Sequence, residues 1–152
     1  MPTLAEEIAT GPLAASLAPL VAAGDDTATA ALLNRRADAF DPPADWTVYR
    51  RAVPRGELLE VVAGMDAIPA LKAAESTSLG WTALRVLENP ASELDFTRAG
   101  TRTLVAALDL IVTGLGAQLS TLGVRPASRA EVLGGEGATV SADDVAKALR
   151  GS

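Results

Sequence analysis

Thr101–Val112, which reads TRTLVAALDLIV, is the stretch that decides the fold class. Its large apolar residues recur at helical spacing: Leu104, Val105, Leu108, Ile111 and Val112. This spacing places them along one side of an α-helix. The sequence therefore predicts a central core helix over these twelve residues.

The composition of the chain extends this prediction to the whole fold. Of the 152 residues, 49% are hydrophobic but only 3% are aromatic, so the core is built from aliphatic side chains and many alanines. Alanine is the best helix former and is depleted in strands. We expect an all-α fold, a compact bundle of short capped helices that forms a single helical domain over residues 1–152.

Start signals for helices recur along the chain. Thr3 with Glu6, Ser128 with Glu131, and Ser141 with Asp144 each have the spacing of a capping box. Asp25, which follows a glycine, is a further N-cap candidate. Additional helices are predicted at 12–23, 56–63, 67–74, 79–87 and 115–122, and a polar link at 91–100.

The segment 44–53 alternates polar and apolar residues enough to form a short strand. We expect an extended connector there instead, because a lone strand has no partner.

The C-terminal stretch from Arg125 is rich in glycine, hydroxyls and acids. Gly134–Gly137 lacks the lysine and hydroxyl of a phosphate-binding loop, and the stretch lacks the ligand register of an EF-hand. We therefore expect a turn between two short helices. This helical pair, residues 126–150, is a candidate for a separately docking tail.

Composition also limits the chemistry of the chain. It contains no cysteine and no histidine, so thiol nucleophiles and imidazole bases or ligands are excluded. The carboxylate pairs lie at helix starts, where the helix dipole accounts for them, and the only lysines, Lys72 and Lys147, have no motif hydroxyl nearby. We expect no enzymatic activity, no catalytic residues, no metal site and no cofactor.

Charge and hydropathy bear on partners and location. The net charge of −6 opposes binding to nucleic acid. The most apolar run, Thr103–Leu115, is too short to span a bilayer, and Glu6 and Glu7 stand where a secretory signal carries positive charge. We expect neither nucleic-acid nor membrane partners, and synthesis in the cytoplasm.

One concentration of basic and aromatic residues is a candidate partner-binding site. It comprises Arg35, Arg36, Trp46, Tyr49, Arg50, Arg51 and Arg55. One interpretation is a patch for an acidic partner, with an acidic protein surface favoured over nucleic acid. The other is a solvated helix end followed by a connector whose aromatic residues anchor it to the core.

Two segments, Glu7–Ala37 and Val124–Leu149, resemble a family of small uncharacterised proteins of tailed bacteriophages and prophages. In that family a Pro-Leu turn precedes an acid-capped helix ending in Leu-Asn, and Ser-Arg-Ala-Glu, a leucine, a glycine turn and an Asp-Val helix come near the C-terminus. The matching residues here are Pro12-Leu13, Leu33-Asn34, Ser128–Glu131, Leu133-Gly134 and Asp144-Val145. The middle of the chain fits in outline, as at 68–74.

The resemblance implies a structural or accessory protein of a tailed-phage virion, made in the host cytoplasm and associated with the tail or neck. Its expected partners are other virion proteins and further copies of itself, as a homo-oligomer or in a symmetric assembly. An alternative is a tail-assembly factor or chaperone that is absent from the virion. A third is a small DNA-binding regulator that uses the arginine cluster.

Overall fold

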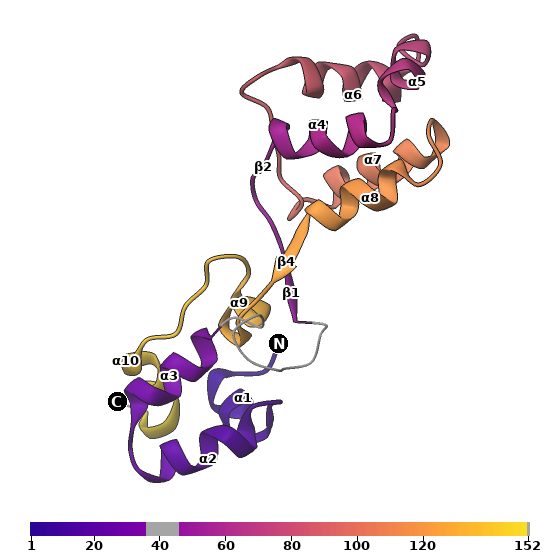
Figure 1. Ribbon diagram of the computed structural model, residues 1–152. Coiled ribbons are helices and arrows are strands. Elements are labelled where there is room, and N and C mark those ends of the chain that lie inside the picture. Colours follow the sequence, from indigo (N-terminus) through magenta and orange to yellow (C-terminus); the bar gives the residue numbers. More distant parts are fainter. Residues whose placement is uncertain (36–45, 152) are drawn as a thin grey trace. The chain divides into compact units, whose positions relative to one another are not determined.

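The computed structural model describes residues 1–35 and 46–151. These residues are mostly helical, with short strands that pair into two two-stranded sheets (Figure 1). The chain divides into two compact units. Unit 1 joins Met1–Val48 with Pro126–Ser152, and unit 2 is the continuous segment Tyr49–Arg125.

This division differs from the single domain that we expected. Each unit has its own apolar cluster, and both crossings between the units fall within short strands. The boundaries, 48/49 and 125/126, fall inside short strands rather than in a long linker, so composition did not locate them.

Unit 1 is built from helices at both ends of the chain. They are α1 (Leu4–Thr10), α2 (Ala14–Ala22), α3 (Asp26–Asn34), α9 (Arg129–Gly134) and α10 (Ala142–Arg150). Their buried apolar residues form one cluster: Ile8, Leu13, Leu17, Ala30, Leu33, Trp46 and Val145. The helical pair near the C-terminus is thus part of unit 1 rather than a tail beside it, because Val145 is fully buried in this cluster.

The predicted caps of unit 1 are confirmed. Thr3, Ser128 and Ser141 each form a full capping box with the acid three residues later. Asp25 caps α3 by accepting a hydrogen bond from the backbone N of Ala28 at 2.9 Å.

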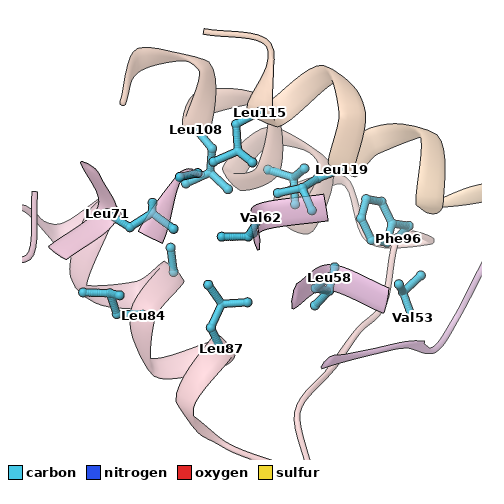
Figure 2. Close-up of a cluster of buried hydrophobic side chains, with 13 residues drawn as sticks. Val53, Leu58, Val62, Leu71, Leu84, Leu87, Phe96, Leu108, Leu115 and Leu119 are labelled. Atoms are coloured by element: carbon cyan, nitrogen blue, oxygen red, sulfur yellow. The ribbon is translucent and has the colours of Figure 1, made fainter. Parts of the chain in front are cut away.

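Unit 2 contains the remaining helices and the second sheet. Its elements are β2 (Val53–Pro54), α4 (Arg55–Gly64), α5 (Ile68–Ala73), α6 (Ser78–Glu88), β3 (Glu93–Leu94), α7 (Ala99–Ala107), the 3₁₀ helix η2 (Leu108–Leu110) and α8 (Leu115–Leu122). Figure 2 shows the aliphatic core between these helices, with Phe96 at one side. Strands β2 and β3 pair antiparallel, with Val53 opposite Leu94.

The central helix is present but shorter than predicted. α7 ends at Ala107 and the chain continues as η2, so the prediction of one helix through Val112 is wrong at its C-terminal end. The carboxylate of Asp109 turns back to accept hydrogen bonds from the backbone N of Gly116 (2.6 Å) and of Ala117 (3.3 Å). These bonds hold the start of α8 against η2, which follows α7. The chain must therefore turn between η2 and α8, and one continuous helix through Val112 is not possible.

The expected connector contains strands, so that expectation is also corrected. Within 44–53, β1 (Thr47–Tyr49) pairs with β4 (Val124–Pro126), and β2 pairs with β3. Hydrogen bonds from Ala127 N to Trp46 O (3.0 Å) and from Arg50 N to Gly123 O (2.9 Å) flank the first pairing. Of the strand partners, β3 lies in the predicted polar link at 91–100, and β4 follows the helix predicted at 115–122.

Candidate functional site

The structure divides the predicted basic and aromatic cluster between the two units. Trp46 belongs to unit 1 and is buried in its core, and Arg35 follows α3 and is exposed. Arg36 lies outside the described residues. The other four members, Tyr49, Arg50, Arg51 and Arg55, belong to unit 2.

Arg50 is engaged in a bidentate ion pair. Its Nη1 and Nη2 donate to the Glu57 carboxylate at 2.6 and 2.9 Å, and Nη1 also donates to the backbone O of Leu122 at 3.1 Å. The hydrogen bonds from Arg50 lower the pKa of Glu57 below its ordinary value of 4.5. Arg50 therefore holds the start of α4 against the end of α8.

Arg55 is likewise part of the fold of unit 2. Its Nε donates to the backbone O of Leu87 at 2.5 Å, and its backbone N donates to the O of Ser92 at 3.1 Å. This satisfies a carbonyl in the last turn of α6, a group that a helix leaves without an internal partner.

Tyr49 stays exposed, with 44% of its surface accessible. The guanidinium of Arg102 lies over its ring, 4.3 Å from the centroid. Arg102 is fixed in turn because its Nη1 donates to the backbone O of Phe96 (2.7 Å) and of Thr97 (2.8 Å). Sequence reasoning missed Arg102, which is 53 positions from Tyr49 and carries no motif.

In unit 1, Trp46 belongs to a buried ion-pair site. Arg129 donates from Nε to Glu7 Oε1 at 2.6 Å and from Nη2 to Glu7 Oε2 at 3.0 Å, and its guanidinium lies 5.5 Å from the Trp46 ring centroid. Glu7 is only 3% exposed. The sequence predicts Glu7 as a helix-start acid and gives no signal for a partner 122 positions away.

The other acids near helix starts have structural roles as well. Glu6 and Asp144 close capping boxes, and hydrogen bonds from Thr3 and Ser141 respectively lower their pKa values. Asp26 forms an ion pair with Arg150. In residues 1–35 and 46–151, no group of three or more acidic, cysteine or histidine residues could hold a metal ion.

The predicted turn at Gly134–Gly137 is confirmed. Gly135 and Gly137 both have positive φ, and Gly137 N donates to Glu131 Oε1 at 3.0 Å. The carboxylate of Glu131 thus occupies the position in front of this amide that a bound phosphate would need.

Unit 2 also carries a surface groove with a largely apolar lining. It is lined by Ala70, Ala73, Ala74, Thr77, Leu79, Leu110 and Ile111. Leu110 is 87% exposed, because the helix turns into η2 and leaves it outside the core. On the neighbouring helix α6, Trp81 is 54% exposed and has Arg85 over its ring at 5.5 Å.

Among the described residues, no helix is both long enough and apolar enough to cross a membrane. No protein-family model, no curated protein and no solved structure matches this chain.

Proposed function

We propose that this protein is a structural or accessory component of a tailed-phage virion, associated with the tail or neck, which acts by packing against other proteins. The observation that carries the proposal is which parts of the sequence form unit 1. The two segments that resemble the phage proteins, Glu7–Ala37 and Val124–Leu149, lie almost entirely within this unit and supply most of it, although unit 2 separates them in sequence.

The matching residues meet inside unit 1. Leu13, Leu33 and Val145 share one buried cluster. Asn34 exchanges two hydrogen bonds with the backbone of Val140, at 2.7 and 2.8 Å. The resemblance therefore falls on residues that hold one compact unit together, and the loosely fitting middle is the other unit.

The polar chemistry of the described residues also favours a packing role. The ion pairs of Arg50, Arg129 and Arg150 hold segments of the fold to each other. Large apolar side chains remain at the surface of unit 2, namely Leu110 and Trp81. Exposed apolar side chains beside a groove are typical of surfaces that bind other proteins.

Quantitative mass spectrometry of density-purified particles tests the proposal. Isotope-labelled peptides from both units would give the copy number of the chain relative to the major capsid and tail-tube proteins. A host cytoplasmic protein and a phage protein known to be absent from virions set the contamination level. We expect a fixed ratio above that level, near a multiple of three, six or twelve for a symmetric ring.

The two alternatives predict different results. A tail-assembly factor or chaperone would be abundant in infected cells, bound to tail proteins during assembly, and absent from finished particles. A DNA-binding regulator would bind duplex DNA with an affinity that falls steeply as salt rises. Absence from particles would overturn the proposal.

A further inference from the structure

We propose that unit 2 carries two complementary surfaces, and that the end of unit 2 around Tyr49 in one copy of the chain binds the apolar groove beside Leu110 in a second copy. This inference rests on the proposed function in one respect, that several copies of the chain lie together in a particle. It names the partner of the groove as another copy of this protein.

The two surfaces lie at opposite ends of unit 2. In Figure 1, α4 begins at β2 and α8 ends at β4, while the other ends of these two helices lie on the side of α5. The groove is lined from α5, the start of α6 and the turn after α7. α4 alone has ten residues, which corresponds to a length of about 15 Å. We call the two regions the strand end and the groove end.

The strand end comprises residues 49–57, 87–102 and 122–125, which hydrogen bonds join into one region. The backbone O of Arg50 accepts from Phe96 N at 2.9 Å, and the backbone N of Arg50 donates to Gly123 O at 2.9 Å. Arg102 binds the carbonyls of Phe96 and Thr97 and stacks on Tyr49. The half-exposed Tyr49 ring is thus held in place by the cation over one of its faces.

The groove end comprises residues 63–79 and 106–117. Three alanines line the groove, and Leu79, Leu110 and Ile111 are the larger apolar side chains of the lining. Alanine side chains leave room for a ring to enter, and Leu110 offers an exposed apolar contact beside it.

Charge distinguishes the two ends. Unit 2 holds eight acidic and eight basic residues, so its net charge is zero. The strand end contains six arginines and four acids, whereas the groove end contains three acids, Asp66, Glu75 and Asp109, and one lysine. Arg85 of α6 pairs with Glu75, so the groove end keeps a smaller negative excess. A positive end therefore meets a negative end when two copies associate head to tail, and like ends repel.

This arrangement is heterologous, because each copy uses a different surface for each neighbour. Such an interface repeats from copy to copy and generates a ring where the rotation closes, or a filament where it does not. Either assembly fits a component that is present in several copies. A two-fold dimer through the groove alone would bring the acidic ends together.

The first test is the concentration dependence of mass, measured on the full chain by sedimentation equilibrium. We expect the weight-average mass to rise beyond that of a dimer as protein concentration increases. The increase should weaken when salt is raised from about 0.1 M to about 1 M, because the screening length falls from about 10 Å to about 3 Å. A monomer at all concentrations and salt levels would overturn the inference.

Two variants test the two surfaces separately. Leu110→Asp places a charge at the groove, and Tyr49→Asp places an acid at the strand end, where Arg102 is positioned to pair with it. Both residues are exposed, and circular dichroism checks that each variant is folded. Each variant alone should be monomeric, because each lacks one of the two surfaces.

Mixing the two variants is the decisive experiment. Leu110→Asp keeps its strand end and Tyr49→Asp keeps its groove, so an equimolar mixture should form dimers that do not grow further. A mixture that stays monomeric, or a Tyr49→Asp variant that still self-associates, would contradict the head-to-tail contact.

Matched controls separate the surfaces from general effects of charge. Ala63→Asp adds the same charge at the groove end, at an exposed position that does not line the groove, and Tyr49→Phe keeps the ring. Both controls should associate as the unmodified chain does. Since these measurements are made in solution, their failure would leave the presence of the chain in particles as a separate result.

Discussion

The side-chain amide of Asn34 pairs with the backbone of Val140, which lies 106 positions further along the chain. Asn34 Nδ2 donates to Val140 O at 2.7 Å, and Val140 N donates to Asn34 Oδ1 at 2.8 Å. Asn34 ends α3 and Val140 precedes the N-cap of α10. One side chain therefore fastens the N-terminal and C-terminal segments of unit 1 to each other.

Asn34→Ala should destabilise unit 1 by about 1–3 kcal/mol, because it removes both bonds and leaves two part-buried backbone groups of Val140 without them. The measurement is urea unfolding followed by fluorescence. Trp46, in the core of unit 1, reports on that unit more strongly than the exposed Trp81 of unit 2.

The matched control is Asn89→Ala. Asn89 is the other asparagine of the chain, and its Oδ1 accepts a bond from Ala91 N at 3.0 Å in an exposed turn of unit 2. This change should leave the Trp46 transition unaltered. Equal losses in the two variants would show that the link between α3 and Val140 has no special role.

Glu7→Gln should destabilise unit 1 more strongly, by about 3 kcal/mol, because it leaves the charge of Arg129 buried without its anionic partner. The neighbouring change Glu6→Gln affects only an exposed capping box, which a glutamine can also close, and should have a much smaller effect. Thermal or urea unfolding, followed by Trp46 emission, distinguishes the two.

A double-mutant cycle with Arg129→Met then separates the pair from its parts. Removing both charges should cost less than the sum of the two single changes, because no unpaired charge remains. Additive losses would mean that Glu7 and Arg129 do not depend on each other.

Local features of the fold could be predicted from the sequence. Thr3, Ser128 and Ser141 each bind a group three residues away, so the capping boxes depend on neighbouring residues alone and were predicted correctly. The end of α7 depends on Asp109 reaching the first turn of α8, and the strands depend on partners tens of residues away. These contacts are tertiary and leave no periodic signal.

In the candidate site, too, the features local to the sequence could be predicted and the tertiary contacts could not. The cluster of arginines and aromatic residues is visible as a run in the sequence, but its members bind different partners. Arg50 binds Glu57, Arg55 binds the carbonyl of Leu87, and Trp46 lies in the core of the other unit. Proximity along the chain therefore did not indicate one surface.

Gly123→Ala should destabilise unit 2 by about 1–3 kcal/mol. A Cβ atom on Gly123 would lie 2.0 Å from Cδ1 of Phe96, which is fully buried, so the ring or the backbone must move.

Gly100→Ala should have the opposite effect on the stability of unit 2. Gly100 lies in α7, and a Cβ there would meet no heavy atom within 4 Å, so the unfolding free energy should rise by about 0.4–1 kcal/mol. Urea unfolding monitored by circular dichroism measures both changes. A Gly123→Ala variant as stable as the unmodified chain would contradict the close packing against Phe96.

The Arg50–Glu57 pair should stabilise unit 2 at neutral pH and cease to do so in acid. Hydrogen bonds from Arg50 lower the pKa of Glu57 below 4.5, so the unfolded chain takes up this proton at a higher pH than the folded chain. The contribution is complete above 4.5 and is lost as pH falls through the folded pKa. Glu57→Gln should therefore unfold at lower urea than the unmodified chain at neutral pH, and the difference should shrink as pH falls below 4.5 and through the folded pKa of Glu57. The effect should be modest, because the Glu57 side chain is 38% exposed and solvent screens the ion pair. Glu60→Gln, in the same helix, provides the control. A difference that persists unchanged in acid would show that the carboxylate charge is not what Arg50 stabilises.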